Sequence, residues 1–140
     1  MGMSDNLCLG MAAVYGFFGV TLAISPAVFW GPDSKFSYWT EMDESGFWFG
    51  RALGVFMASV VTSPYWAGMS KKSLTKVFLP INALWLYFFY QAAFELKSTG
   101  PAPQNILPFN MWLTQLPVAV GLLGMNVLAL GEADGKGKSE

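Results

Sequence analysis

The sequence contains no histidine and only one cysteine, Cys8. Without histidine the chain lacks the commonest metal and haem ligand and the commonest general base. A single cysteine excludes both a disulfide within the chain and a metal cluster held by several thiolates. We therefore predict no catalytic residue, no metal site and no tightly held cofactor, and a bound lipid or quinone is the ligand class left open.

Charged residues are also scarce. Lys, Arg, Asp and Glu make up 12% of the 140 residues, about half of the roughly 25% that is usual in soluble domains. Eight basic and nine acidic residues leave a formal net charge of −1, so the chain offers no basic surface for the phosphates of a nucleic acid. The composition is instead 54% hydrophobic and 16% aromatic. We therefore expect no nucleic acid partner, and the lipid bilayer is the predicted environment.

Four long stretches carry no charged side chain, and they cover residues 6–32, 52–70, 77–94 and 98–131. A helix needs about 20 mostly apolar residues to cross a hydrocarbon core of about 30 Å. Allowing for the short polar links between the stretches, we expect transmembrane helices at about residues 7–29, 46–68, 76–96 and 107–130.

The predicted fold is therefore all-α, an integral membrane four-helix bundle with short loops that forms a single domain over residues 1–130. The polar, glycine-rich residues 131–140 are expected to form a disordered tail. Apolar core helices of a soluble protein are the alternative, but 140 residues leave no room for an amphipathic shell around four such helices. A cleaved signal peptide is disfavoured because the first ten residues contain no Lys or Arg.

The orientation of a multi-pass protein follows from the Lys and Arg residues of its short loops. With four spans, one side of the membrane would hold the N-terminus, the link between the second and third helices, and the tail. The basic residues on that side are Lys71, Lys72, Lys76, Lys136 and Lys138. Those on the other side are Lys35, Arg51 and Lys97. This bias predicts that both termini lie on the cytoplasmic or equivalent side.

The second predicted helix carries a row of small residues spaced four apart: Gly46, Gly50, Gly54 and Ala58. Such a row forms a smooth groove along one helix face, and it lets a neighbouring backbone approach closely inside a bilayer. We predict that this face packs against the first helix or against another chain.

Polar residues inside spans are costly and are functional candidates by default. If the second and third helices run antiparallel, Arg51 and Glu95 lie at similar depth in one leaflet. One interpretation places both in the headgroup region with their charged ends in water; the other is a polar pocket with Glu95 as counter-ion to Arg51. The acidic segment of Glu41, Asp43 and Glu44 competes with Glu95 as the partner of Arg51, or it caps a short interfacial helix. The further candidates for that pocket are Tyr87, Gln91, Asn110, Thr114 and Gln115. The opposite half of the bundle offers chiefly Thr62, Asn82 and Asn126.

A first span that contains a late proline, Pro26, is followed by a short link and a second span that opens with Arg-Ala-Leu-Gly at residues 51–54. Over residues 7–95 this pattern resembles the DoxX-like group of small four-helix membrane proteins. The resemblance implies an accessory role, either beside quinone-linked oxidoreductase complexes or in the chaperoning of membrane proteins.

The sequence is compatible with three functions. The first is an accessory, assembly or structural subunit that associates with other membrane-protein subunits or with itself. The second is a binder, carrier or enzyme for a lipophilic molecule of the quinone or sterol type, with its polar pocket near Arg51. The third is an oligomeric channel or exchanger, since charges from several protomers would be needed to line an ion path.

Overall fold

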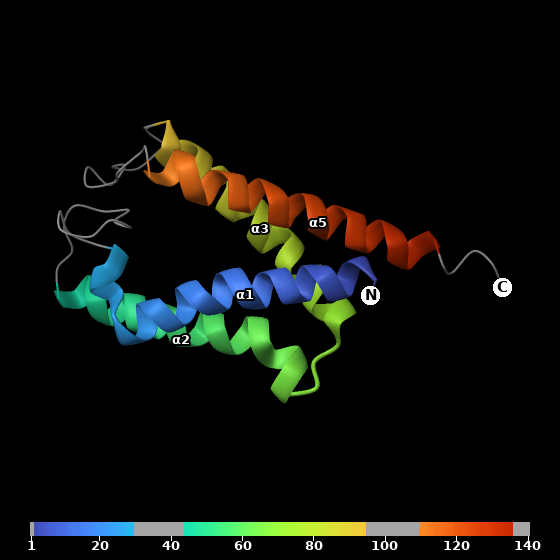
Figure 1. Cartoon of the computed structure of the whole chain (residues 1–140), viewed down its shortest axis with the longest axis horizontal. Helices are drawn as coiled ribbons and strands as arrows, with labels where there is room; N and C mark the ends of the chain where they lie inside the picture. The colour runs from blue at the N-terminus through green and yellow to red at the C-terminus, as the bar shows by residue number, and fades with distance from the viewer. Residues whose placement is uncertain (1, 30–43, 95–109, 136–140) are drawn as a thin grey trace.

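The computed structural model describes residues 2–29, 44–94 and 110–135, and these residues are helical with no strand among them. Four long helices account for most of them (Figure 1). Their bounds are α1 Met3–Ile24, α2 Glu44–Trp66, α3 Lys71–Ala93 and α5 Leu116–Gly135. Two short helical turns adjoin them, η1 at Pro26–Phe29 after α1 and η2 at Met111–Gln115 before α5. The predicted all-α class is confirmed.

Helix α1 begins and ends earlier than the predicted 7–29. At its start the Gly2 backbone N–H donates a hydrogen bond to the Asp5 carboxylate over 3.1 Å, which satisfies one of the unpaired donors of the first turn. At its end Ser25 leaves the helical conformation, with φ −139° and ψ 69°, because a residue before proline is disfavoured there. Pro26 then opens the separate turn η1.

A tight turn joins α2 to α3. Gly68 has a φ of +67°, a left-handed conformation that glycine adopts without steric cost. Ser70 then caps α3, because its hydroxyl accepts a hydrogen bond from the Ser73 backbone N–H over 3.4 Å. With this cap in place α3 starts at Lys71, earlier than the predicted start at 76.

The last helical segment starts with a wide turn and runs further than predicted. Pro117 has no N–H to donate to the carbonyl four residues earlier, so one hydrogen bond of a regular α-helix is missing at this point. Directly before it, the Leu116 N–H donates to the Met111 carbonyl, five residues back, which makes the turn wider than that of an α-helix. At the other end α5 continues to Gly135, beyond the predicted helix end at 130. The disordered tail over residues 131–140 stays a prediction. Ala and Glu in residues 132–135 favour helix. Residues 136–140 lie outside the described residues.

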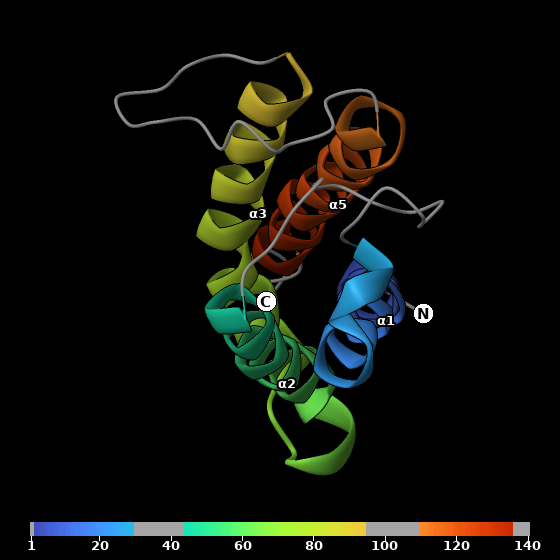
Figure 2. The ribbon, with the colours of Figure 1, turned by 90° about the vertical axis from the view of Figure 1, so that its left-hand side faces the viewer.

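The helices form two pairs. Helix α1 packs most extensively against α2, and α3 packs against α5, while α1 joins the pairs through contacts with α5 and with α3. In Figure 2 the pair of α3 and α5 lies in the upper part of the view, and the pair of α1 and α2 lies in the lower part. The beginning of α1, the α2–α3 turn and the end of α5 lie at one end of the molecule (Figure 1). We call this end the terminal end, and we call the opposite end, with η1 and η2, the loop end.

The buried apolar side chains form two clusters. The larger joins all four long helices: Leu7, Cys8, Met11, Tyr15, Val61, Leu74, Phe78, Leu122 and Ala129. The smaller one joins η1, the end of α3 and η2: Phe29, Ala93 and Met111. The helices are thus fixed to one another chiefly by the larger cluster.

Much of the apolar surface is not covered by the protein itself. By length and composition two helical segments, Met3–Ile24 and Met111–Gly131, are apolar enough to cross a membrane. Only 33% and 28% of their most apolar stretches are buried in the molecule, whereas a core helix of a soluble protein is mostly buried. Among the described residues, α2 and α3 do not meet the same test of length and composition.

Candidate functional site

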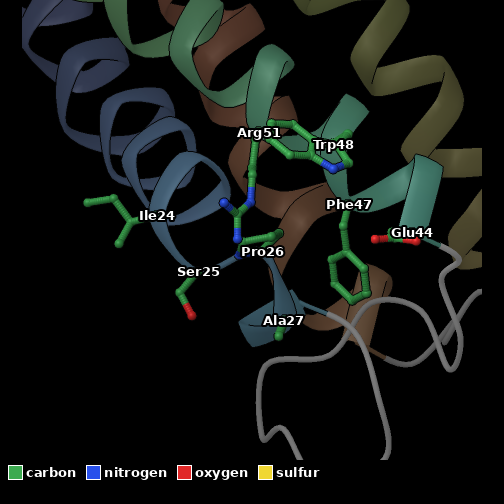
Figure 3. Close-up of a pocket in the computed structure, with 8 residues that line it drawn as sticks. All are labelled: Ile24, Ser25, Pro26, Ala27, Glu44, Phe47, Trp48 and Arg51. Atoms are coloured by element: carbon green, nitrogen blue, oxygen red, sulfur yellow. The ribbon is translucent and has the colours of Figure 1, made fainter.

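A pocket of about 390 Å³ lies at the loop end, between the end of α1, turn η1 and the beginning of α2. Figure 3 shows the side chains that surround it. They are Ile24, Ser25, Pro26, Ala27, Glu44, Phe47, Trp48 and Arg51. The pocket therefore exists because Pro26 ends α1 and turns the chain across the start of α2.

Arg51 is the cation of this pocket. Its side chain is exposed, and its guanidinium carbon lies 5.7 Å from the centre of the Trp48 ring. A guanidinium at this distance is attracted to the negative face of the indole. Figure 3 shows the Arg51 side chain directed toward Pro26, with Glu44 on the other side of Phe47. Arg51 and Glu44 form no ion pair with each other or with any other described residue.

The other predicted members of this site lie elsewhere. Tyr87 and Gln91 are on α3, where the Gln91 side-chain amide donates a hydrogen bond to the Tyr87 hydroxyl over 2.7 Å. Thr114 donates to the Asn110 backbone carbonyl over 2.8 Å, and Gln115 is buried in η2. Among the described residues, none of these five lines the pocket with Arg51.

Glu95, the predicted counter-ion of Arg51, lies outside the described residues. Among the described residues, the acidic side chain that shares the pocket with Arg51 is Glu44, two helical turns before it on α2. Because both residues belong to one short helical segment, the pocket holds one positive and one negative charge without any contribution from α3.

The row of small residues on α2 meets α1 at Gly54 and Ala58. A Cβ placed on Gly54 would lie 2.5 Å from the Gly19 carbonyl oxygen and 2.7 Å from the Ala23 backbone nitrogen. A Cβ on Gly19 would lie 2.7 Å from the Gly54 carbonyl oxygen and 2.8 Å from the Ala58 backbone nitrogen. The backbones of the two helices therefore touch at Gly19 and Gly54. Gly50 is also buried, and Gly46 is partly buried at the helix start.

A chain of buried hydrogen bonds links α1, α3 and α5. The Tyr15 hydroxyl donates to Asn82 Oδ1 over 2.6 Å, and Asn82 Nδ2 donates to Asn126 Oδ1 over 2.6 Å. Asn126 Nδ2 in turn donates to the Thr75 backbone carbonyl over 2.7 Å. Asn82 and Asn126 have no exposed surface. Each amide thus has a partner for its carbonyl oxygen and for its nitrogen.

We call Tyr15, Asn82, Asn126 and Thr75 the buried amide chain. Its two amides, Asn82 and Asn126, lie in charge-free apolar stretches of the sequence, and this position marks them as polar residues inside predicted spans. The sequence could not show that these two amides meet, because they are 44 residues apart in the chain. Thr62, the third polar residue expected in that half, donates instead to the Ala58 carbonyl of its own helix over 2.7 Å.

At the terminal end an ion pair joins the beginnings of α1 and α3. Lys71 Nζ lies 2.6 Å from Asp5 Oδ1, and both side chains are partly exposed. The hydrogen bond to Asp5 raises the pKa of Lys71 above its ordinary value. Such a pair in contact with water contributes little to stability, so it serves chiefly to keep this end polar.

Neither a protein family model, nor a curated protein, nor a solved structure matches this chain. The functional conclusion therefore depends on the geometry alone. That geometry combines three features: an apolar exterior, a pocket with two charges at the loop end, and a buried amide chain within the bundle.

Proposed function

We propose that this chain is a multi-pass integral membrane protein that acts as an accessory, assembly or structural subunit of a larger membrane complex. Both termini and the α2–α3 turn would face the cytoplasm or its equivalent. Such a protein needs an exterior that lipids and neighbouring helices can cover, and helices that are held together without help from water.

The exposed apolar surface carries this proposal. Large apolar side chains are exposed on all four long helices; an example from each helix is Phe17 at 64%, Phe56 at 66%, Phe88 at 53% and Val127 at 58%. A soluble monomer rarely exposes a continuous apolar patch of more than a few hundred Å². Lipid tails or the helices of partner subunits would cover such a surface and keep it out of water.

The outer face of α5 supports contact with a partner helix. A Cβ placed on Gly121 or on Gly124 would have no neighbouring atom within 4 Å, so both glycines leave space at the surface of the molecule. Small residues on a helix face let another transmembrane helix come close. They contrast with Gly19 and Gly54, whose faces are already filled within the chain.

The test is purification of the native protein in a mild detergent, with its mass measured by light scattering and its partners identified by mass spectrometry. We expect a stoichiometric protein partner, and we expect Gly121→Leu and Gly124→Leu to release it without loss of helix content. Ala83→Leu, a similar enlargement at an exposed site on α3, is the matched control and should retain the partner. A preparation that contains only single 15.3 kDa chains would contradict the proposal.

The pocket at the loop end favours a second function, a binder or carrier of a lipophilic molecule. The pocket combines the Arg51 guanidinium with the rings of Phe47 and Trp48, and a few polar groups on an apolar wall are typical of ligand sites. Lipid extracts of the purified protein test this idea. We expect one lipophile per chain in the wild type and a loss of that lipophile in Arg51→Gln.

A further inference from the structure

The pocket at the loop end carries a matched pair of opposite charges. Glu44 and Arg51 both line it, and seven residues of helix separate them by about 10 Å along the axis of α2. Within the described part of the chain neither makes an ion pair. Both charges are therefore available to a ligand that carries a negative and a positive group of its own.

Two aromatic rings, those of Trp48 and Phe47, lie next to the two charged groups of the pocket. The Trp48 ring attracts the Arg51 guanidinium from 5.7 Å, which holds the guanidinium beside the pocket. Phe47 lies beside Glu44 in Figure 3, and an aromatic face next to a carboxylate is a favourable environment for an ammonium group. The two ends of the pocket thus differ in the charge that they accept.

The surroundings of the pocket fit lipid tails. Ile24 is 73% exposed, Trp48 68% and Phe49 71%, and all three lie on the segments that form the pocket or continue it. In the proposed membrane arrangement the end of α1 and the beginning of α2 lie at headgroup depth, where arginine and tryptophan are favoured. A ligand with its polar group in the pocket would therefore have its apolar part against exposed apolar side chains.

We propose that this pocket binds the headgroup of a zwitterionic phospholipid, with the phosphate on Arg51 and the ammonium on Glu44 beside Phe47. An anionic headgroup without an ammonium would bring a phosphate near Glu44 with no compensating charge. A quinone or a sterol has no cationic group for Glu44. The inference rests on the proposed membrane location and names the ligand class of the pocket.

The experiment titrates the purified full chain in detergent with dioleoyl phosphatidylethanolamine or dioleoyl phosphatidylglycerol, and it counts bound lipids by native mass spectrometry. We expect one bound phosphatidylethanolamine, with an affinity about tenfold above that for phosphatidylglycerol, because two charge-assisted contacts replace one contact and one repulsion. Arg51→Gln should weaken both lipids about tenfold. Glu44→Gln should remove the preference, because phosphatidylethanolamine loses its ammonium contact and binds more weakly, whereas phosphatidylglycerol is no longer repelled and binds more strongly.

Lys72→Gln is the matched control, since Lys72 is exposed at the terminal end and its loss should change neither affinity. Helix content and thermal midpoint report whether each variant is folded. Should Arg51→Gln fail to fold, Arg51→Lys retains the charge without the two-pronged donor geometry, and it should bind more weakly than the wild type. Equal affinities of the folded wild type for the two lipids would overturn the inference, as would unchanged binding in folded Arg51→Gln or Arg51→Lys.

The two proposals fail separately. Lipid binding is counted on the purified chain and needs no protein partner, so loss of headgroup selectivity in a preparation that still holds its partner overturns only the headgroup site. A wild-type chain that is washed from vesicles at alkaline pH would overturn the membrane location, and with it both proposals.

Discussion

At the scale of single residues, we expect the stability of the bundle to depend strongly on the buried amide chain. Asn82 and Asn126 have no exposed surface, so a polar group that loses its partner there is left buried and unsatisfied. The sequence identifies both amides as polar residues in apolar stretches. It does not identify their partners, because the pairing depends on which faces of α1, α3 and α5 meet in space.

We expect Tyr15→Phe and Asn82→Leu each to destabilise the protein, and the double variant to lose less than the sum of the two. Asn82→Leu leaves the Tyr15 hydroxyl and Asn126 Oδ1 without their partners, and an unsatisfied buried group costs about 1–3 kcal/mol. Couplings between helices in membranes average about 0.6 kcal/mol and reach about 1.7 kcal/mol. Reversible unfolding in detergent measures them.

Tyr87→Phe is the control for this pair. It also removes a hydroxyl that accepts a hydrogen bond, but Tyr87 is 53% exposed, and a surface change of this kind stays within about 0.5 kcal/mol. Strictly additive effects of Tyr15→Phe and Asn82→Leu would show that the 2.6 Å contact between them contributes no coupling.

At the scale of elements, the sequence predicts the number and approximate positions of the helices, because charge-free stretches and polar links alternate clearly. It misplaces their ends where local backbone chemistry intervenes: Pro26 ends α1 early, and Ser70 starts α3 early. The small-residue row on α2 is visible in the sequence. Gly19 belongs to a similar row of small residues on α1, and its backbone contact with Gly54 becomes apparent only when the two helices are placed together.

We expect Gly54→Leu to destabilise the protein by about 1–3 kcal/mol, the usual cost of overpacking. Even Gly54→Ala should be harmful, since its Cβ would meet backbone atoms of α1 at 2.5 Å and 2.7 Å, and backbone cannot move aside as a flexible side chain can. Gly46→Leu, at the partly buried start of α2, should cost less. Thermal unfolding in detergent measures each change.

Gly124→Ala provides the matched comparison within α5. Its new methyl group would meet nothing within 4 Å, and alanine favours helix over glycine by about 1 kcal/mol. We therefore expect equal or higher stability for Gly124→Ala. Equal thermal midpoints for Gly54→Ala and Gly124→Ala would mean that α1 and α2 are not in backbone contact.

At the scale of the whole molecule, two helix pairs form one body with a terminal end and a loop end (Figure 1). The sequence predicts a polar site at the loop end around Arg51, and a pocket with Arg51 lies there. The sequence also assigns to that site two residues of α3 and three residues in or directly before η2, because all five are expected at the same depth in the bundle. Equal depth does not place side chains in one pocket, since Tyr87 and Gln91 bond to each other on another helix.

The most direct test of the membrane arrangement is the accessibility of single cysteines to a membrane-impermeant thiol reagent. The native Cys8 is fully buried, so the wild type serves as the unlabelled control. Ser45 and Ser73 are exposed in the first turns of α2 and α3, and these two helices begin at opposite ends of the molecule (Figure 1). If all four long helices cross the bilayer, Ser73→Cys and Ser139→Cys react from the cytoplasmic or equivalent side, and Ser45→Cys and Ser98→Cys react from the other. Labelling of Ser45→Cys and Ser73→Cys from the same side would contradict the four-span arrangement.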